Sequence, residues 1–237
     1  MPAGNNELEH SFSAKIFEYI KKKQYFCTLI GKAMKQLFTI IALLICCTAP
    51  AQVSDSALFA AYQREDMQVW KEYIERQTQS AKHRTQALLY EYGYCGYIVA
   101  EAKKEGKEAL MPEAKRCVQQ FKAHVEALRT QLSVGHYEMY LSAVYVFELR
   151  LHESIHPFKS MSLAKEATKL APNDPLVLSY YGTCLFYAPK PFGDKAEALK
   201  WFEKAQKRFT GTQWAFCWVR EANEMYIRQC HEKLKKH

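Results

Sequence analysis

The sequence is poor in the residues that break regular structure. Glycine and proline supply only nine and eight of its 237 residues. This scarcity argues against a turn-rich, all-β domain. Apolar residues make up 49% of the chain, which is enough to bury a sizeable core. We therefore expect a helical protein with one main domain.

Most catalytic motifs are missing as well. The sequence has no G-x-S-x-G, no glycine-rich phosphate loop and no paired C-x-x-C. The exception is one formal H-E-x-x-H zinc-peptidase motif: His152-Glu153-Ser154-Ile155-His156. Pro157 follows it directly, and no third ligand motif continues it. We interpret the motif as a polar helix end, keep a zinc hydrolase as an alternative, and predict no catalytic residue, metal or cofactor.

No apolar run is long enough to span a bilayer. The longest, LFTIIALLICCT at residues 37–48, falls short of the roughly 18 residues required. It follows the basic start Met34-Lys35 and precedes the small-x-small triplet Ala49-Pro50-Ala51, as in a secretory signal peptide. We expect residues 34–51 to be removed, leaving an exported (periplasmic or secreted) protein without stable membrane insertion. Residues 1–33, an upstream extension of doubtful status, are interpreted either as a membrane-surface helix or as an upstream artefact or long leader before a start at Met34, and we favour the second interpretation.

The charges do not suggest a nucleic-acid partner. The formal net charge is +8, and it falls to +5 when residues 1–51 are left out. Basic and acidic residues alternate along the predicted helices, as in Lys103, Lys104 and Glu105. Such mixing is typical of a solvated face and not of a basic stripe.

Apolar periodicity predicts about eight helices and no strand between residues 52 and 237. We expect them at 55–77 (broken near Glu65-Asp66), 81–105, from Pro112 onward, 137–152, 158–170, 175–187, 195–209 and 213–235. Cys95 and Cys117 fall on neighbouring antiparallel helices. They can pair as a disulfide or remain buried thiols, and we interpret them as buried thiols.

The segment 161–209 contains one set of small, aromatic and turn residues at characteristic spacings. Its members are Ala167, Pro172, Leu178, Tyr181, Gly182, Leu185, Ala198, Phe202 and Ala205. This pattern resembles the tetratricopeptide repeat, with four extra residues in the loop APKPFGD. The loop and the following helix are also similar to those of exported tetratricopeptide proteins from Bacteroidota.

The resemblance implies an all-α, right-handed solenoid of helical hairpins, with about three pairs and a C-terminal capping helix, over residues 52–237. It also implies a concave partner groove, with these positions: Leu176, Ser179, Thr183 and Phe186. We expect a non-catalytic adaptor or scaffold of the bacterial cell envelope that binds a protein segment there. Two alternatives remain: the zinc hydrolase, and a small-molecule-binding protein of a transport system, with a closed cavity among Tyr92, Tyr140 and Phe186.

Overall fold

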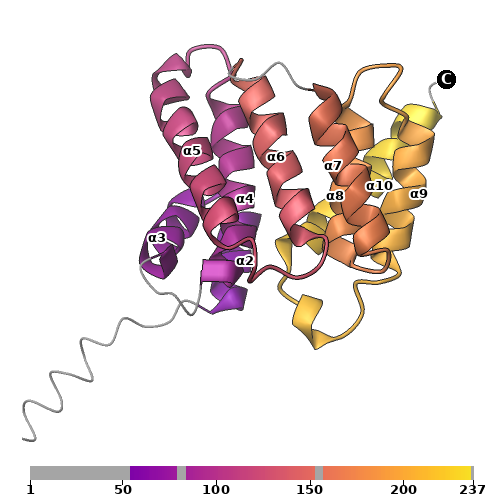
Figure 1. Ribbon diagram of the computed structural model, residues 1–237, viewed down its shortest axis with the longest axis horizontal. Helices are drawn as coiled ribbons and strands as arrows, with labels where there is room; N and C mark the ends of the chain where they lie inside the picture. Colours follow the sequence, from indigo (N-terminus) through magenta and orange to yellow (C-terminus); the bar gives the residue numbers. More distant parts are fainter. Residues whose placement is uncertain (1–53, 79–83, 153–156, 236–237) are drawn as a thin grey trace, which may run out of the picture. The chain divides into compact units, whose positions relative to one another are not determined.

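All regular structure in the described residues is helical (Figure 1). The computed structural model describes residues 54–78, 84–152 and 157–235. The helices are α2 (Asp55–Gln63), α3 (Met67–Thr78), α4 (Arg84–Glu101), α5 (Met111–Ala127), α6 (His136–Arg150), α7 (Pro157–Leu170), α8 (Pro175–Tyr187), α9 (Lys195–Gln206) and α10 (Trp218–Leu234). The all-α prediction is confirmed for this part of the chain. The predicted signal peptide and the extension before it lie outside the described residues.

Left-handed backbone explains where two helices end. The predicted break in 55–77 is present between α2 and α3, where Glu65 has φ 58°. α6 ends at Arg150 and not at the predicted residue 152, because His152 has φ 61°, which no right-handed helix accommodates.

The last helix begins five residues later than predicted. Gly211, with φ 95°, is followed by the short 3₁₀ helix η2 (Thr212–Trp214). The Trp214 ring packs on Phe209 at 5.3 Å between centroids. The apolar spacing that suggested a helix from residue 213 thus reflects a tryptophan that covers the end of the preceding α9 segment.

From α3 to α10, each helix packs on the next one along the chain (Figure 1). The most extensive contacts join α6 with α7 and α8 with α9. The two ends of this series also meet: Phe59 of α2 lies 6.3 Å from Phe216 and Tyr62 lies 5.8 Å from Trp218, ring centre to ring centre. The C-terminal helix therefore does more than cover the last hairpin, because its first turn also contacts α2 and α3.

The small residues of the repeat pattern lie at helix crossings. A Cβ atom on Gly182 would stand 2.8 Å from two carbons of the Phe202 ring, which is fully buried. Ala198 and Ala205 are fully buried on the same helix as Phe202. Ala167 is buried in α7, Leu178, Tyr181 and Leu185 in α8, and Pro172 is exposed in the turn between the two helices.

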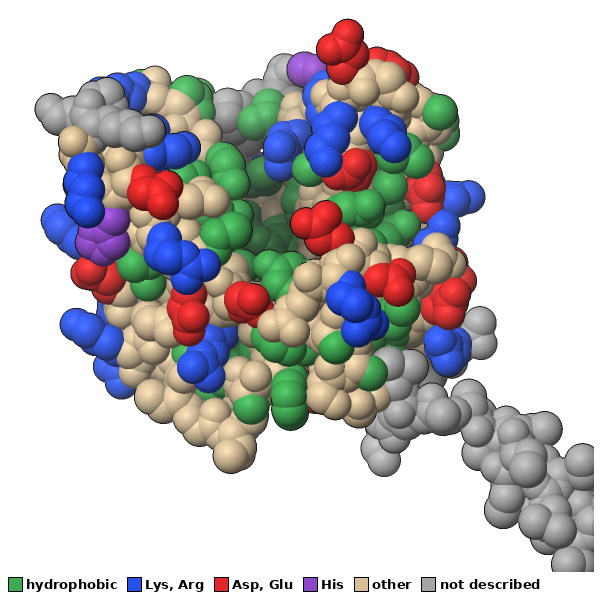
Figure 2. Space-filling model, turned by 180° about the vertical axis from the view of Figure 1, so that it is seen from behind, with side chains coloured by type: hydrophobic (Ala, Val, Ile, Leu, Met, Phe, Trp, Pro, Cys, Tyr) green, Lys and Arg blue, Asp and Glu red, His purple; other side chains and the backbone are tan. Residues whose placement is uncertain are grey.

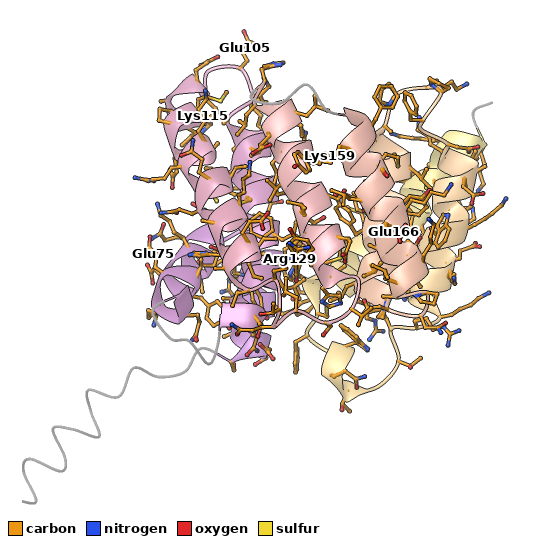
Figure 3. The ribbon with its side chains drawn as sticks, in the orientation of Figure 1. Glu75, Glu105, Lys115, Arg129, Lys159 and Glu166 are labelled. Carbon is orange, nitrogen blue, oxygen red and sulfur yellow. The ribbon has the colours of Figure 1, made fainter. Side chains whose placement is uncertain are left out.

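Several outward-facing cations lie over tyrosine rings. The Arg129 guanidinium carbon is 4.8 Å from the centre of the Tyr137 ring, and Lys159 Nζ is 4.5 Å from that of Tyr145 (Figure 3). These cations cover aromatic surface that would otherwise face water.

Among the described residues, no helix combines the length and the apolar character needed to cross a membrane.

Asp174 caps α8 and also joins it to α6. Its Oδ1 accepts hydrogen bonds from the backbone N–H groups of Leu176 (2.9 Å) and Val177 (3.1 Å). Its Oδ2 lies 3.0 Å from His136 Nε2. Burial alone would raise the pKa of Asp174, but the hydrogen bond and charge of His136, together with the two N–H donors, lower it overall.

Replacing Asp174 with alanine should lower the free energy of unfolding by about 1–2 kcal/mol at neutral pH. The lowered pKa means that this contribution is fully present above the unfolded-state value near 4, and is lost as pH falls through the folded-state pKa. The free energies of unfolding of the wild type and Asp174→Ala, measured by urea titration across this pH range, should therefore become equal at low pH. Asp194→Ala is the matched control, because Asp194 caps α9 in the same way but is solvent-exposed. If Asp174→Ala lowered the free energy of unfolding by the same amount at every pH, the contribution assigned to the Asp174 carboxylate would be contradicted.

Candidate binding groove

A cavity of about 840 Å³ opens between the helices (Figure 2). Its lining comes from α2, α3, α4, α6, α7, α8 and α10, from the α2–α3 turn and from the α8–α9 loop. We call this cavity and its rim the groove. Figure 2 shows it as a hollow whose visible walls are mostly hydrophobic, with charged side chains on the surfaces around it. The groove exists because the ends of the helix series meet and leave a recess between them.

An aromatic cluster centred on Trp218 forms one wall of the groove. Its ring centre lies 5.5 Å from that of Trp70, 5.8 Å from Tyr92 and 5.8 Å from Tyr62. Gly93 lets this cluster form, since a Cβ there would stand 2.5 Å from Trp70 and 2.9 Å from Trp218. Trp218 is not among the four predicted groove positions, because its packing against α3 and α4 joins distant parts of the chain.

Glycine also shapes the wall contributed by α4. Gly96 lines the groove one helical turn after Gly93. A Cβ on Gly96 would meet only Phe147, at an ordinary contact distance of 3.8 Å. Gly96 is therefore a position from which a larger side chain can enter the groove without a backbone clash.

Large apolar side chains are exposed around the mouth of the groove. They are Tyr97 (38% exposed), Leu149 (36%), Phe158 (67%), Tyr187 (63%) and Phe192 (43%), and all five line it. Phe158 and Phe192 face each other from α7 and the α8–α9 loop, with ring centres 5.0 Å apart in an edge-to-face arrangement. Single exposed apolar residues are ordinary, but a contiguous group around a recess is typical of an interaction site.

The charged groups that line the groove include an ion pair between Glu101, the last residue of α4, and Lys104, three residues further along the chain. Deeper in, burial raises the pKa of Tyr92 and of Tyr180 well above the usual range of a phenol. Burial likewise raises the pKa of the Cys184 thiol to about 12. These three side chains are therefore neutral at physiological pH, so the interior favours an uncharged ligand surface.

A polar connection holds the helices behind the groove in register. The Ser142 hydroxyl of α6 donates to the carbonyl oxygen of Ser160 in α7, at 2.6 Å, and lies 2.9 Å from the Tyr180 hydroxyl of α8. Ser142 is fully buried, so both contacts are shielded from water. Ser160 and Tyr180 line the groove, and Ser142 thus links two of its lining residues across three helices.

The four predicted groove positions are distributed over three places. Thr183 lines the groove, and its hydroxyl donates to the Ser179 carbonyl oxygen at 3.0 Å. Leu176, Ser179 and Thr183 line a separate, smaller cavity of about 60 Å³, between α4, α6, α8 and α10. Phe186 lines neither cavity: it is buried, and its ring packs 5.5 Å from Tyr226 and 6.5 Å from Phe202.

The residues of the predicted closed cavity differ in their surroundings. Tyr92 lines the groove, and its ring centre lies 6.3 Å from that of Tyr140. Tyr140 and Phe186 are buried and line neither cavity described above. A packing contact with α9 and α10 accounts for Phe186.

The H-E-x-x-H motif begins outside a helix. His152 follows the end of α6, and its Nε2 lies 3.1 Å from Lys103 Nζ. Residues 153–156, with the glutamate and the second histidine, lie outside the described residues. In the described ranges, no three His, Cys, Asp or Glu side chains are grouped as a metal site would require.

Comparison with known proteins adds no relative. No family model, curated protein or solved structure matches this chain. The functional assignment therefore depends on the groove itself.

Proposed function

We propose that this protein is a non-catalytic binding module that takes up an apolar segment of a protein partner in the groove. The observation that carries the proposal is a neutral, aromatic recess whose mouth is surrounded by exposed apolar side chains. Burying the five rim side chains together would be favourable, because each Å² of apolar surface removed from water contributes about 25 cal/mol.

The size of the groove suits a short helix. An α-helix with its side chains is about 10 Å across, so 840 Å³ corresponds to roughly two helical turns. Two turns present apolar anchors at positions i, i+3, i+4 and i+7, the usual pattern of helix-in-groove recognition. A partner segment with three or four large apolar side chains on one face would match the aromatic lining.

The helix order is consistent with a tetratricopeptide-like array. Consecutive antiparallel packing, the Gly182–Phe202 contact and the buried alanines of α9 support this part of the proposal. The spacing of the signal peptide motif supports an exported protein of the bacterial cell envelope. Such arrays usually bind their partners on an inner, concave surface, as proposed here.

A second candidate is a small apolar molecule. The volume of about 840 Å³ lies within the range of roughly 300–1,000 Å³ that is common for small-molecule sites. The neutral interior suits such a ligand as well. Native mass spectrometry of the purified protein would detect a retained molecule as added mass.

Filling the groove from Gly96 tests both candidates. Gly96→Trp should reduce recovery of a groove-bound protein from an envelope extract by about tenfold or more, since a blocked central pocket costs at least about 2 kcal/mol. Gly96→Ala, which adds only a methyl group, should bind like the wild type. Both variants should be checked for folding by circular dichroism. Equal capture by Gly96→Trp and wild type would contradict the groove assignment. A retained small molecule lost only in Gly96→Trp, with no protein captured, would favour the second candidate.

A further inference from the structure

Two cysteines face each other between neighbouring helices. Cys95 of α4 and Cys117 of α5 have their Sγ atoms 2.7 Å apart. The helices that carry them pack directly on each other. Cys95 is fully buried, whereas Cys117 is half-buried. We propose that these residues form a disulfide bond that joins α4 to α5, in place of the two buried thiols that the sequence favoured.

The positions satisfy the main geometric demand of a disulfide. A bridge needs two side chains that point toward each other and bring their sulfur atoms together. Here both sulfur atoms already meet in the helix interface. The remaining described cysteines, Cys184, Cys217 and Cys230, contribute to other parts of the structure. Forming the bond shortens the distance between the two sulfur atoms from 2.7 Å to the usual bond length of about 2.05 Å.

The chemistry follows from the different exposure of the two sulfurs. The thiolate of half-buried Cys117 attacks a disulfide oxidant, either an oxidoreductase disulfide or a small-molecule disulfide, and one oxidant thiol leaves. Cys95 then loses its proton and attacks Cys117 Sγ, and the second oxidant thiol leaves. The protein gives up two protons and two electrons, and the oxidant takes them up to become two thiols. The predicted export of the chain would bring it into a compartment where such oxidants are present.

The surroundings of Cys95 favour a bridge over a reactive thiol. Burial, followed by the contacts with Cys117 and Glu91, raises the pKa of Cys95 well above its usual value. A catalytic or redox-sensing thiol needs the opposite shift. Cys95 also immediately precedes Gly96, which lines the groove, so the bond would anchor this wall of the groove to α5 from behind.

The test is peptide mapping of the purified full chain. The folded protein is incubated with oxidised glutathione, unfolded with an alkylating agent present, and digested with trypsin. Trypsin places the cysteines on separate peptides, 85–103 and 117–122, each with no other cysteine. We expect a linked pair of these peptides that disappears on reduction. Cys184→Ser should retain it, and Cys117→Ala should lose it.

Thermal unfolding provides a second readout. Reduction should lower the unfolding temperature of the wild type by roughly 5–10 °C, because the open chain gains conformational entropy when unfolded. Cys117→Ala should show no such response. Full alkylation of both cysteines after oxidation of the folded protein, or an unfolding temperature that reduction leaves unchanged, would overturn the proposal.

Discussion

Replacing Gly93 with alanine lowers the free energy of unfolding by about 1–3 kcal/mol, the cost of overpacking a filled interior. The added Cβ would stand 2.5 Å from a ring carbon of Trp70 and 2.9 Å from one of Trp218. Trp70 is 1% exposed, and its indole N–H donates to the Leu58 carbonyl oxygen at 2.8 Å, so the ring is held in place. The clash exceeds the gain of up to about 1 kcal/mol from removing glycine from a helix.

Gly96→Ala is the matched control three residues later on the same helix. Its Cβ meets only Phe147 at 3.8 Å, so the helix gain of about 0.5–1 kcal/mol should remain. Urea denaturation at constant pH measures both variants. Equal stability of the two, or a stabilised Gly93→Ala, would show that the Trp70–Trp218 contact does not restrict this position.

These two glycines show what sequence reasoning can and cannot reach. Both fall within the helix predicted at 81–105, so their positions in that helix are local information. The atoms that the glycines approach are not local information, because Trp218 lies more than a hundred residues further along the chain. Only the meeting of α10 with α3 and α4 distinguishes a crowded glycine from one that faces an open groove.

The difference between local and long-range information also explains which of the other sequence-based predictions were correct. α8 was predicted with its observed bounds, because Pro175 and the capping residue Asp174 are local signals. The start of the last helix was predicted wrongly, because Trp214 packs on Phe209 through a 3₁₀ turn that apolar spacing does not reveal. Thr183 lines the groove, whereas Phe186, three residues later on α8, is buried against Phe202 and Tyr226. Which face of a helix borders a groove depends on the packing of the whole series.

The contact between α8 and α9 carries the second large effect. Phe202 is fully buried, its ring stacks on Tyr226 with centres 5.2 Å apart, and its edge rests on Gly182. Phe202→Ala should lower the free energy of unfolding by about 3–5 kcal/mol, through lost burial and the cavity left behind. Gly182→Ala alone should cost about 1–2 kcal/mol, since the new methyl group meets the Phe202 ring.

The two changes should not be additive. In the Phe202→Ala background the methyl group of Gly182→Ala enters vacated space, so the second change should cost little or even stabilise, a coupling of about 1–2 kcal/mol in urea denaturation. Phe209→Ala is the matched control, because Phe209 is buried near the end of the same segment but packs on Trp214 and does not touch Gly182. In the Phe209→Ala background, Gly182→Ala should still lower the free energy of unfolding by about 1–2 kcal/mol. Additive losses with Phe202→Ala would mean that the glycine serves helix bending and not close packing, and the repeat-like crossing of α8 and α9 would lose its main support.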